Sequence, residues 1–182
     1  MKDITLEFGL LIAYAIPGAF VLFALAPIVP ELAALLTLPD DQKWLSTAIL
    51  LAGLSIALGM FSSVVRALTI DGSFLLPLPW AVKVGPHWGA QGRVDPDYSV
   101  LKNKDALVAL QDVRSTDKRP YQFYGNMLVA LAILEFSRVA HGKASSAEVG
   151  FGILVGLAFY LASRKSHFRY MSAVRAINGK DA

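Results

Sequence analysis

Four long apolar segments constrain the fold of this chain more than any other feature of its sequence. They are residues 8–29, 44–68, 123–139 and 147–163. A helix needs about 20 apolar residues to cross a hydrocarbon core of about 30 Å. The first two segments meet that length, and the last two are shorter, so by length alone they could be buried or re-entrant helices. Because Arg138, Arg164 and Lys165 can extend toward the headgroups, we predict four crossings and an all-α integral membrane bundle of four transmembrane helices.

Composition agrees with that class and excludes several others. Hydrophobic residues make up 55% of the chain and charged residues only 17%, which is too apolar for an ordinary soluble domain. The absence of cysteine excludes disulfides, thiolate metal sites and thiol nucleophiles. The first apolar run is too long for a cleaved signal peptide and lacks a small-x-small cleavage site, so it is predicted to be a retained span. The net charge of +3 is spread around the spans, which argues against direct nucleic acid binding.

The basic residues predict an orientation in a bacterial inner membrane with both termini in the cytosol. Of the 17 basic residues, only Lys43, Arg138 and Lys143 then lie outside, and the first outer loop carries acids instead. The chain divides into transmembrane helices 1 and 2, a cytosolic insert, transmembrane helices 3 and 4, and a basic cytosolic tail. Their bounds are residues 1–70, 71–120, 121–163 and 164–182.

Local signals predict the shape of these parts. Pro17 and Gly18 predict a kink or a break in the first span, and Pro30–Leu36 is expected to run as a helix along the outer surface. The insert is predicted to lie against the membrane, with Trp80 and Trp88 at the headgroup level. Asp95-Pro96-Asp97 predicts the start of an amphipathic helix over residues 98–113.

The basic tail is predicted to continue the fourth helix along the membrane surface. Its apolar residues would face lipid and its basic residues would contact anionic headgroups. The apolar residues are Phe168, Met171 and Val174.

Two faces of small residues predict close helix packing. Ser55, Gly59 and Ser62 share one side of the second span, and they could pack against another helix or line a narrow pore in an oligomer. Gly152 and Gly156 form a GxxxG pattern on the fourth span, which often joins subunits. These faces predict a homo-oligomer.

Polar residues at the ends of spans are the candidate functional residues, because charge is costly there. Arg66 is predicted to pair with Asp71 and fix the start of the insert, or to bind a lipid phosphate. Gln122 and Asn126 lie four apart on the third span, where they could bond to a neighbouring helix or bind a partner. Glu135 and Arg138 are expected to pair near the outer boundary.

No pattern in the sequence indicates catalysis. His87, His141 and His167 belong to separate parts of the chain, and no HExxH, GxSxG or phosphate-binding loop is present. We therefore expect no metal, no cofactor and no enzymatic activity, with an intramembrane enzyme as the least favoured alternative.

Three features of the chain resemble uncharacterised bacterial four-span integral membrane proteins. They are the Pro17-Gly18 pair, Arg66 followed by Thr69-Ile70-Asp71, and the run from Tyr121 to Asn126. The resemblance covers most of the chain and implies the four-span topology. It also singles out Arg66, Asp71 and Asn126, and it implies no catalytic residue.

Two functions then compete. The first is an oligomeric channel or membrane-perturbing effector controlled from the cytosolic side, as in phage defence. The second is a non-conducting anchor or sensor that recruits a cytosolic protein partner. A channel would turn Ser55, Gly59 and Ser62 toward a shared axis, whereas an anchor would bury them against another helix.

Overall fold

The computed structural model describes residues 2–37, 44–71 and 104–178, and every element in these ranges is a helix. The elements in chain order are α1 (Lys2–Leu25), α2 (Pro30–Leu36), α3 (Trp44–Thr69), α4 (Lys104–Val113), the π-helical turn η5 (Arg114–Lys118), α5 (Arg119–Ala140) and α6 (Ser146–Ile177). The predictions for Trp80, Trp88, the helix start at residues 95–97 and the last residues of the tail lie outside the described residues.

Three helical runs are long and apolar enough to cross a membrane. They are α3, the continuous run Lys104–Ala140, and α6. Together, α1 and α2 form a fourth candidate span that is bent by 120° between its two parts. This bend lies at residues 26–29, whereas α1 stays helical through Pro17 and Gly18, where the sequence predicted a kink or a break. The lengths and compositions agree with a membrane location.

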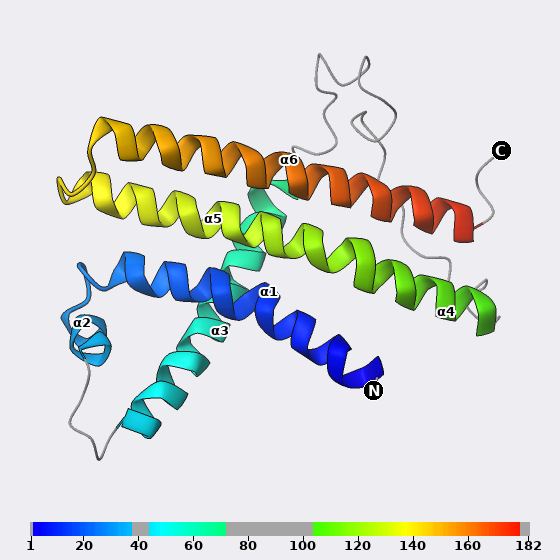
Figure 1. The fold of residues 1–182 in the computed structure, drawn as a ribbon, viewed down its shortest axis with the longest axis horizontal. Coiled ribbons are helices and arrows are strands. Elements are labelled where there is room, and N and C mark those ends of the chain that lie inside the picture. The colour runs from blue at the N-terminus through cyan, green and yellow to red at the C-terminus, as the bar shows by residue number, and fades with distance from the viewer. Residues whose placement is uncertain (1, 38–43, 72–103, 179–182) are drawn as a thin grey trace.

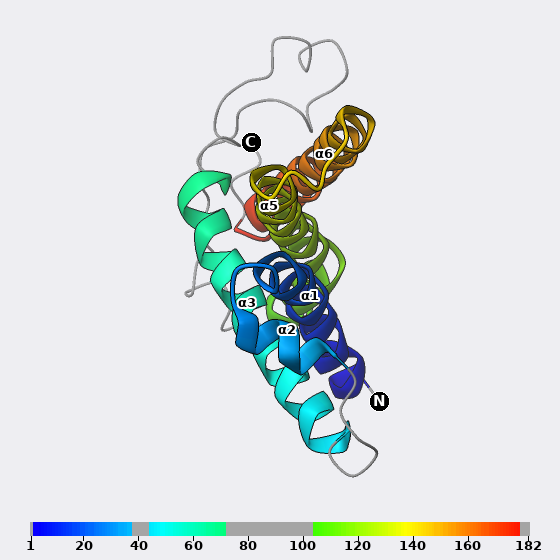
Figure 2. The same ribbon diagram turned by 90° about the vertical axis from the view of Figure 1, so that its left-hand side faces the viewer.

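The long helices form a layer, with α3 crossing on one side of it (Figures 1 and 2). Helices α1, α3 and α5 pack on one another, and α6 joins them mainly through its contact with α5. Figure 2 shows α6, α5 and α1 following one another in a row. The arrangement therefore differs from four helices around a common axis.

Helices α1 and α3 approach closely because glycine stands at both crossing points. A Cβ atom at Gly18 would overlap the backbone carbonyl of Ser55, and one at Gly59 would overlap the carbonyl of Tyr14. Ser62 is fully buried, and its hydroxyl donates to the Leu58 carbonyl of its own helix at 3.0 Å. The predicted small-residue face of α3 thus lies inside the chain: Ser55 and Gly59 contact α1, Gly59 and Ser62 are buried, and Ser55 is half-buried.

The turn that joins α5 to α6 lies at one end of the layer, opposite the start of α4 and the end of α6 (Figure 1). Ser145 and Glu148 form a capping box at the start of α6, which satisfies backbone donors there. The predicted pair is present, with Arg138 Nη1 3.6 Å from Glu135 Oε1. Glu148 is the closer partner, 2.8 Å from Arg138 Nη2.

At the other end, α4 and η5 pack beside residues 164–177 of α6, and we call this pair of helices the two-helix extension. Its core consists of Leu110, Tyr170, Met171 and Val174. Phe168 and Val174 are fully buried and Met171 nearly so. The prediction that these three residues of the tail face lipid is therefore wrong. Because α4, η5 and α5 form one continuous helical run, the tail has a helix of the same chain to pack on.

The π-helical turn η5 has a local cause in Pro120. A proline within a helix cannot donate to the carbonyl four residues earlier, and its ring crowds that carbonyl. The wider turn relieves this conflict, and the Arg119 amide bonds to the Arg114 carbonyl instead. The run Lys104–Ala140 therefore stays helical across the proline.

Candidate functional site

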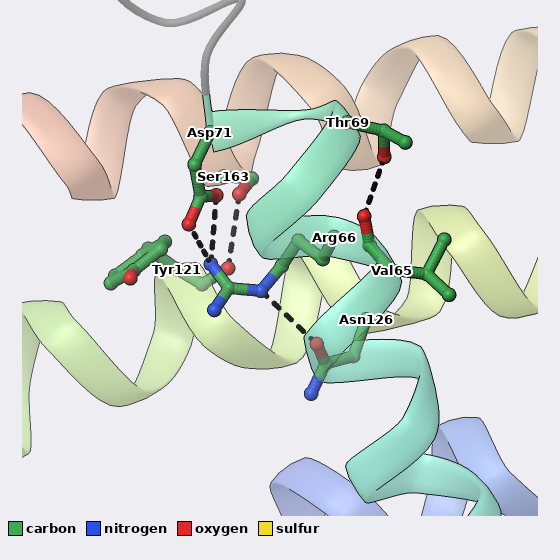
Figure 3. A network of polar contacts seen from close by, with 7 residues as sticks. All are labelled: Val65, Arg66, Thr69, Asp71, Tyr121, Asn126 and Ser163. Atoms are coloured by element: carbon green, nitrogen blue, oxygen red, sulfur yellow. Dashed lines mark hydrogen bonds and ion pairs between the residues drawn. The ribbon is translucent and has the colours of Figure 1, made fainter.

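Arg66 lies at the last turn of α3, and its side chain is only 4% exposed. The helix ends three residues later, after which the Ile70 amide still bonds to the Arg66 carbonyl at 2.8 Å. This turn brings Asp71 back over the guanidinium, as Figure 3 shows. Asp71 accepts from Arg66 Nη1 at 2.9 Å through Oδ1 and at 3.1 Å through Oδ2. The ion pair predicted between these residues is present.

Two residues of α5 complete the surroundings of Arg66. Its Nε donates to Asn126 Oδ1 at 3.2 Å, and its guanidinium carbon lies 4.7 Å from the centre of the Tyr121 ring. A Cβ atom at Gly125 would overlap the stem of Arg66, so this glycine gives the buried arginine its room. A buried guanidinium is tolerated only when it is paired and hydrogen-bonded, and these contacts meet that condition.

Asn126 also repairs a defect in α1. Pro17 has no N–H group, so the carbonyl of Ala13, four residues earlier, lacks its helical donor. Asn126 Nδ2 donates to that carbonyl at 3.2 Å. Both Asn126 and Ala13 are almost fully buried, where water could not supply the bond. One amide therefore bonds to α1 with its nitrogen and to α3 with its oxygen.

Ser163 connects α6 to the same place. Its hydroxyl is fully buried and donates to the Tyr121 carbonyl at 3.0 Å (Figure 3). We call Arg66, Asp71, Tyr121, Asn126 and Ser163 the Arg66 cluster. With the Ala13 carbonyl, this cluster joins all four long helices through polar contacts.

Further aromatic and basic groups extend the cluster toward the two-helix extension. The ring of His167 meets Tyr121 edge-on, with 5.3 Å between ring centroids. Arg164 is fully buried, its guanidinium lies 4.8 Å from the Phe168 ring, and its Nη1 is 3.4 Å from the Tyr160 hydroxyl. Aromatic faces favour such cations through their quadrupole.

Positive charge also dominates at η5, just before α5. Burial lowers the pKa of Lys118, and the charges of Arg114 and Arg66 lower it further. Burial raises the pKa of Asp117, and the charge of Arg169 opposes this shift. Charged side chains of η5 and α6 therefore lie close enough for the charge of one to shift the pKa of the other.

The other predicted site residues lie apart from the Arg66 cluster. Gln122 is half-buried one turn before Asn126. Gly152 and Gly156 face α5 of the same chain: a Cβ atom at Gly152 would meet the Glu135 carboxylate at 2.9 Å, and one at Gly156 would meet Leu128 at 3.4 Å. Self-association stays a prediction, and it would need a face other than this one.

Sequence reasoning missed Ser163, the Ala13 carbonyl and the role of Pro17 in this site. A serine beside Arg164 at the end of an apolar run was the available signal for Ser163. The helical rule that links Pro17 to the carbonyl four residues earlier also marked Ala13 as needing a donor.

The Arg66 cluster has the chemistry of a structural link. Its groups are donors and acceptors that satisfy one another across helices. In residues 2–37, 44–71 and 104–178, no three His, Asp or Glu side chains gather in a way that could hold a metal ion.

Comparison with known proteins adds no assignment to this site. No family model, no curated protein and no solved structure matches the chain.

Proposed function

We propose that this chain is a non-conducting membrane anchor, and that its rigid transmembrane part holds a helical extension for a cytosolic partner. In this proposal the chain crosses a bacterial inner membrane four times, with both termini in the cytosol. The observation that carries the proposal is the burial of the small-residue face of α3 against α1. A pore along Ser55, Gly59 and Ser62 would need that face open to water.

The contacts at this face leave no space for an ion path within one chain. The backbone of α1 touches that of α3 at both Gly18 and Gly59. To open a path there, α1 would have to separate from α3 and give up the bond between Asn126 and the Ala13 carbonyl. A channel or membrane-perturbing effector would therefore have to break contacts that the anchor keeps.

The lengths of the helices support a role outside the bilayer. At 1.5 Å per residue, the 37-residue run that ends in α5 is about 55 Å long, and the 32-residue α6 is about 48 Å long. Both exceed a hydrocarbon core of about 30 Å. Because the two-helix extension has its own apolar core, it can project from the membrane as a folded unit.

The Arg66 cluster would serve this anchor as the rigid base of its cytosolic parts. Asp71 is the first residue of the insert, and the ion pair with Arg66 fixes its position. Ser163 and Tyr121 stand where α6 and α5 lead into the two-helix extension. The same cluster thus holds the start of the insert and the points at which α5 and α6 join the two-helix extension.

Potassium flux from liposomes tests the non-conducting part of the proposal. Liposomes with the purified chain should release potassium as slowly as empty liposomes, with an added ionophore as the positive control. The variant Ser62→Ala changes the buried face, and Ser63→Ala on the neighbouring position is its matched control. Flux above background that Ser62→Ala alters and Ser63→Ala does not would establish a conducting path along α3 instead.

Cross-linking in cells tests the partner. Leu107 and Val108 expose apolar side chains on α4, with 42% and 58% of their surface accessible. A photo-cross-linker at position 108 should capture one cytosolic protein, whereas one at Ile153, on the exposed apolar side of α6, should capture lipid. Lipid at both positions would contradict a projecting extension.

A further inference from the structure

Four basic residues form a collar around the junction between the transmembrane part and the two-helix extension. We define the basic collar as Arg114 and Lys118 of η5 with Lys165 and Arg169 of α6. Arg114, Lys165 and Arg169 are exposed and Lys118 is half-buried, so their charged ends can reach a ligand.

The two halves of the basic collar lie on helices that contact each other. Lys118 Nζ lies 5.7 Å from the centre of the Tyr170 ring, next to Arg169 in the chain. Asp117, the acid of η5, lies in the field of Arg169. Lys165 and Arg169 stand four residues apart, on one side of α6. The four cations therefore lie on one turn of η5 and on the adjoining stretch of α6.

Cations outnumber carboxylates around the basic collar, where Asp112 stands two residues before Arg114 at the end of α4 and Asp117 lies within η5. Between Glu148 and the end of the described part of α6, the sequence contains no acidic residue. Within η5 itself, Asp117 is the single carboxylate, and it is half-buried. The repulsion that Lys118 feels from Arg114 would be relieved by an anion held between these side chains.

The position along the helices identifies the anion. Tyr121 and Ser163 mark the last uncharged turns of α5 and α6, and the basic collar follows within about 3 to 10 Å at 1.5 Å per residue. That is the depth of lipid headgroups beside a hydrocarbon core. We propose that the basic collar binds the phosphate groups of anionic lipid headgroups. This proposal rests on the membrane orientation given above and not on a cytosolic partner.

Lipid phosphate suits the basic collar better than free phosphate does. Its cations sit on the outside of two helices and are largely exposed, so they cannot enclose a small ion and exclude water. Headgroups are instead held at a fixed depth and high local concentration, where each nearby Lys or Arg adds to the attraction. Because Phe168, Met171 and Val174 are buried, the contact relies on charge and not on apolar side chains inserted into lipid.

Native mass spectrometry of the full chain in a neutral detergent tests this site. Bound phosphatidylglycerol should exceed bound phosphatidylcholine. Each charge removed should weaken phosphatidylglycerol binding about fivefold, so Lys165→Gln with Arg169→Gln should weaken it roughly 25-fold. Arg114→Gln alone, on the other helix, should weaken it about fivefold. The control Lys143→Gln removes an exposed charge at the α5–α6 turn and should leave binding unchanged.

Several results would overturn the site. Equal binding of the two lipids would do so, as would unchanged binding by the double variant with wild-type helicity in circular dichroism. If inorganic phosphate displaces the lipid more strongly than sodium chloride of the same ionic strength, the ligand is a soluble anion and the assignment to lipid is wrong. Because conduction is measured separately as potassium flux, failure here and failure of the anchor are distinguishable.

Discussion

Replacing Asn126 by leucine should reveal how much stability one buried amide supplies. The change keeps a similar volume and removes two bonds, from Arg66 Nε to Oδ1 and from Nδ2 to the Ala13 carbonyl. A bond to a charged group contributes about 1.5–3 kcal/mol, and a buried polar group left without a partner costs about 1–3 kcal/mol. We therefore expect Asn126→Leu to lower the free energy of unfolding by about 3–5 kcal/mol.

The part of this loss that belongs to Ala13 can be isolated through Pro17. The substitution Pro17→Ala restores an N–H at position 17, which can donate to the Ala13 carbonyl within α1. In that background Asn126→Leu removes only the bond to Arg66, so it should cost about 1–3 kcal/mol less than in the wild-type chain. Such a coupling across 109 positions of sequence would identify Asn126 as the replacement donor for Pro17.

Unfolding of the four chains in mixed micelles, followed by far-ultraviolet circular dichroism, measures this coupling. The matched control is Gln122→Leu, which removes a half-buried amide one turn earlier on α5 and should be additive with Pro17→Ala. If the losses from Asn126→Leu and Pro17→Ala also add within about 0.5 kcal/mol, the reasoning that links them is refuted.

Three other substitutions test the packing of the same chain. Asp71→Asn removes the carboxylate partner of buried Arg66 and should lower the free energy of unfolding by about 1–3 kcal/mol in the same assay; an unchanged value would show that water replaces Asp71 there. Gly59→Leu should abolish a cooperative thermal transition because α1 occupies the space, whereas Gly53→Leu, with open space around it, should melt like the wild type. Gly152→Leu should lower the melting temperature without changing the oligomer mass in mild detergent, and Gly150→Leu should change neither. A lower oligomer mass for Gly152→Leu would place this face between subunits.

Local rules predicted the parts of the structure that depend on neighbouring residues. The apolar helices follow from hydropathy, and the helix Pro30–Leu36 was predicted with its observed bounds. The pairs Arg66–Asp71 and Glu135–Arg138 were also predictable, because their members are five and three positions apart at the ends of helices. The second pair follows from helix geometry, and the first from the short turn that ends α3.

Contacts between distant helices were beyond those rules. The partners of Asn126 are 60 and 113 positions away, and no periodicity tells which faces of α1, α3 and α5 meet. The tail was misjudged for the same reason. An amphipathic helix with basic residues suits a membrane surface, but α4 offered its apolar side a protein partner instead.

The features that the sequence showed separately belong to one arrangement in the structure. Pro17 deprives a buried carbonyl of its donor, Asn126 supplies that donor, and the other end of the same amide accepts from Arg66, which in turn holds Asp71. Each of these residues is costly by itself, since a helical proline, a buried amide and a buried guanidinium all destabilise a chain in lipid. Together they satisfy one another, so the loss of any one of them should leave the next one buried without its bonding partner. In the anchor that we propose, this dependence makes the Arg66 cluster a rigid base, whereas a path for ions between α1 and α3 would have to break it.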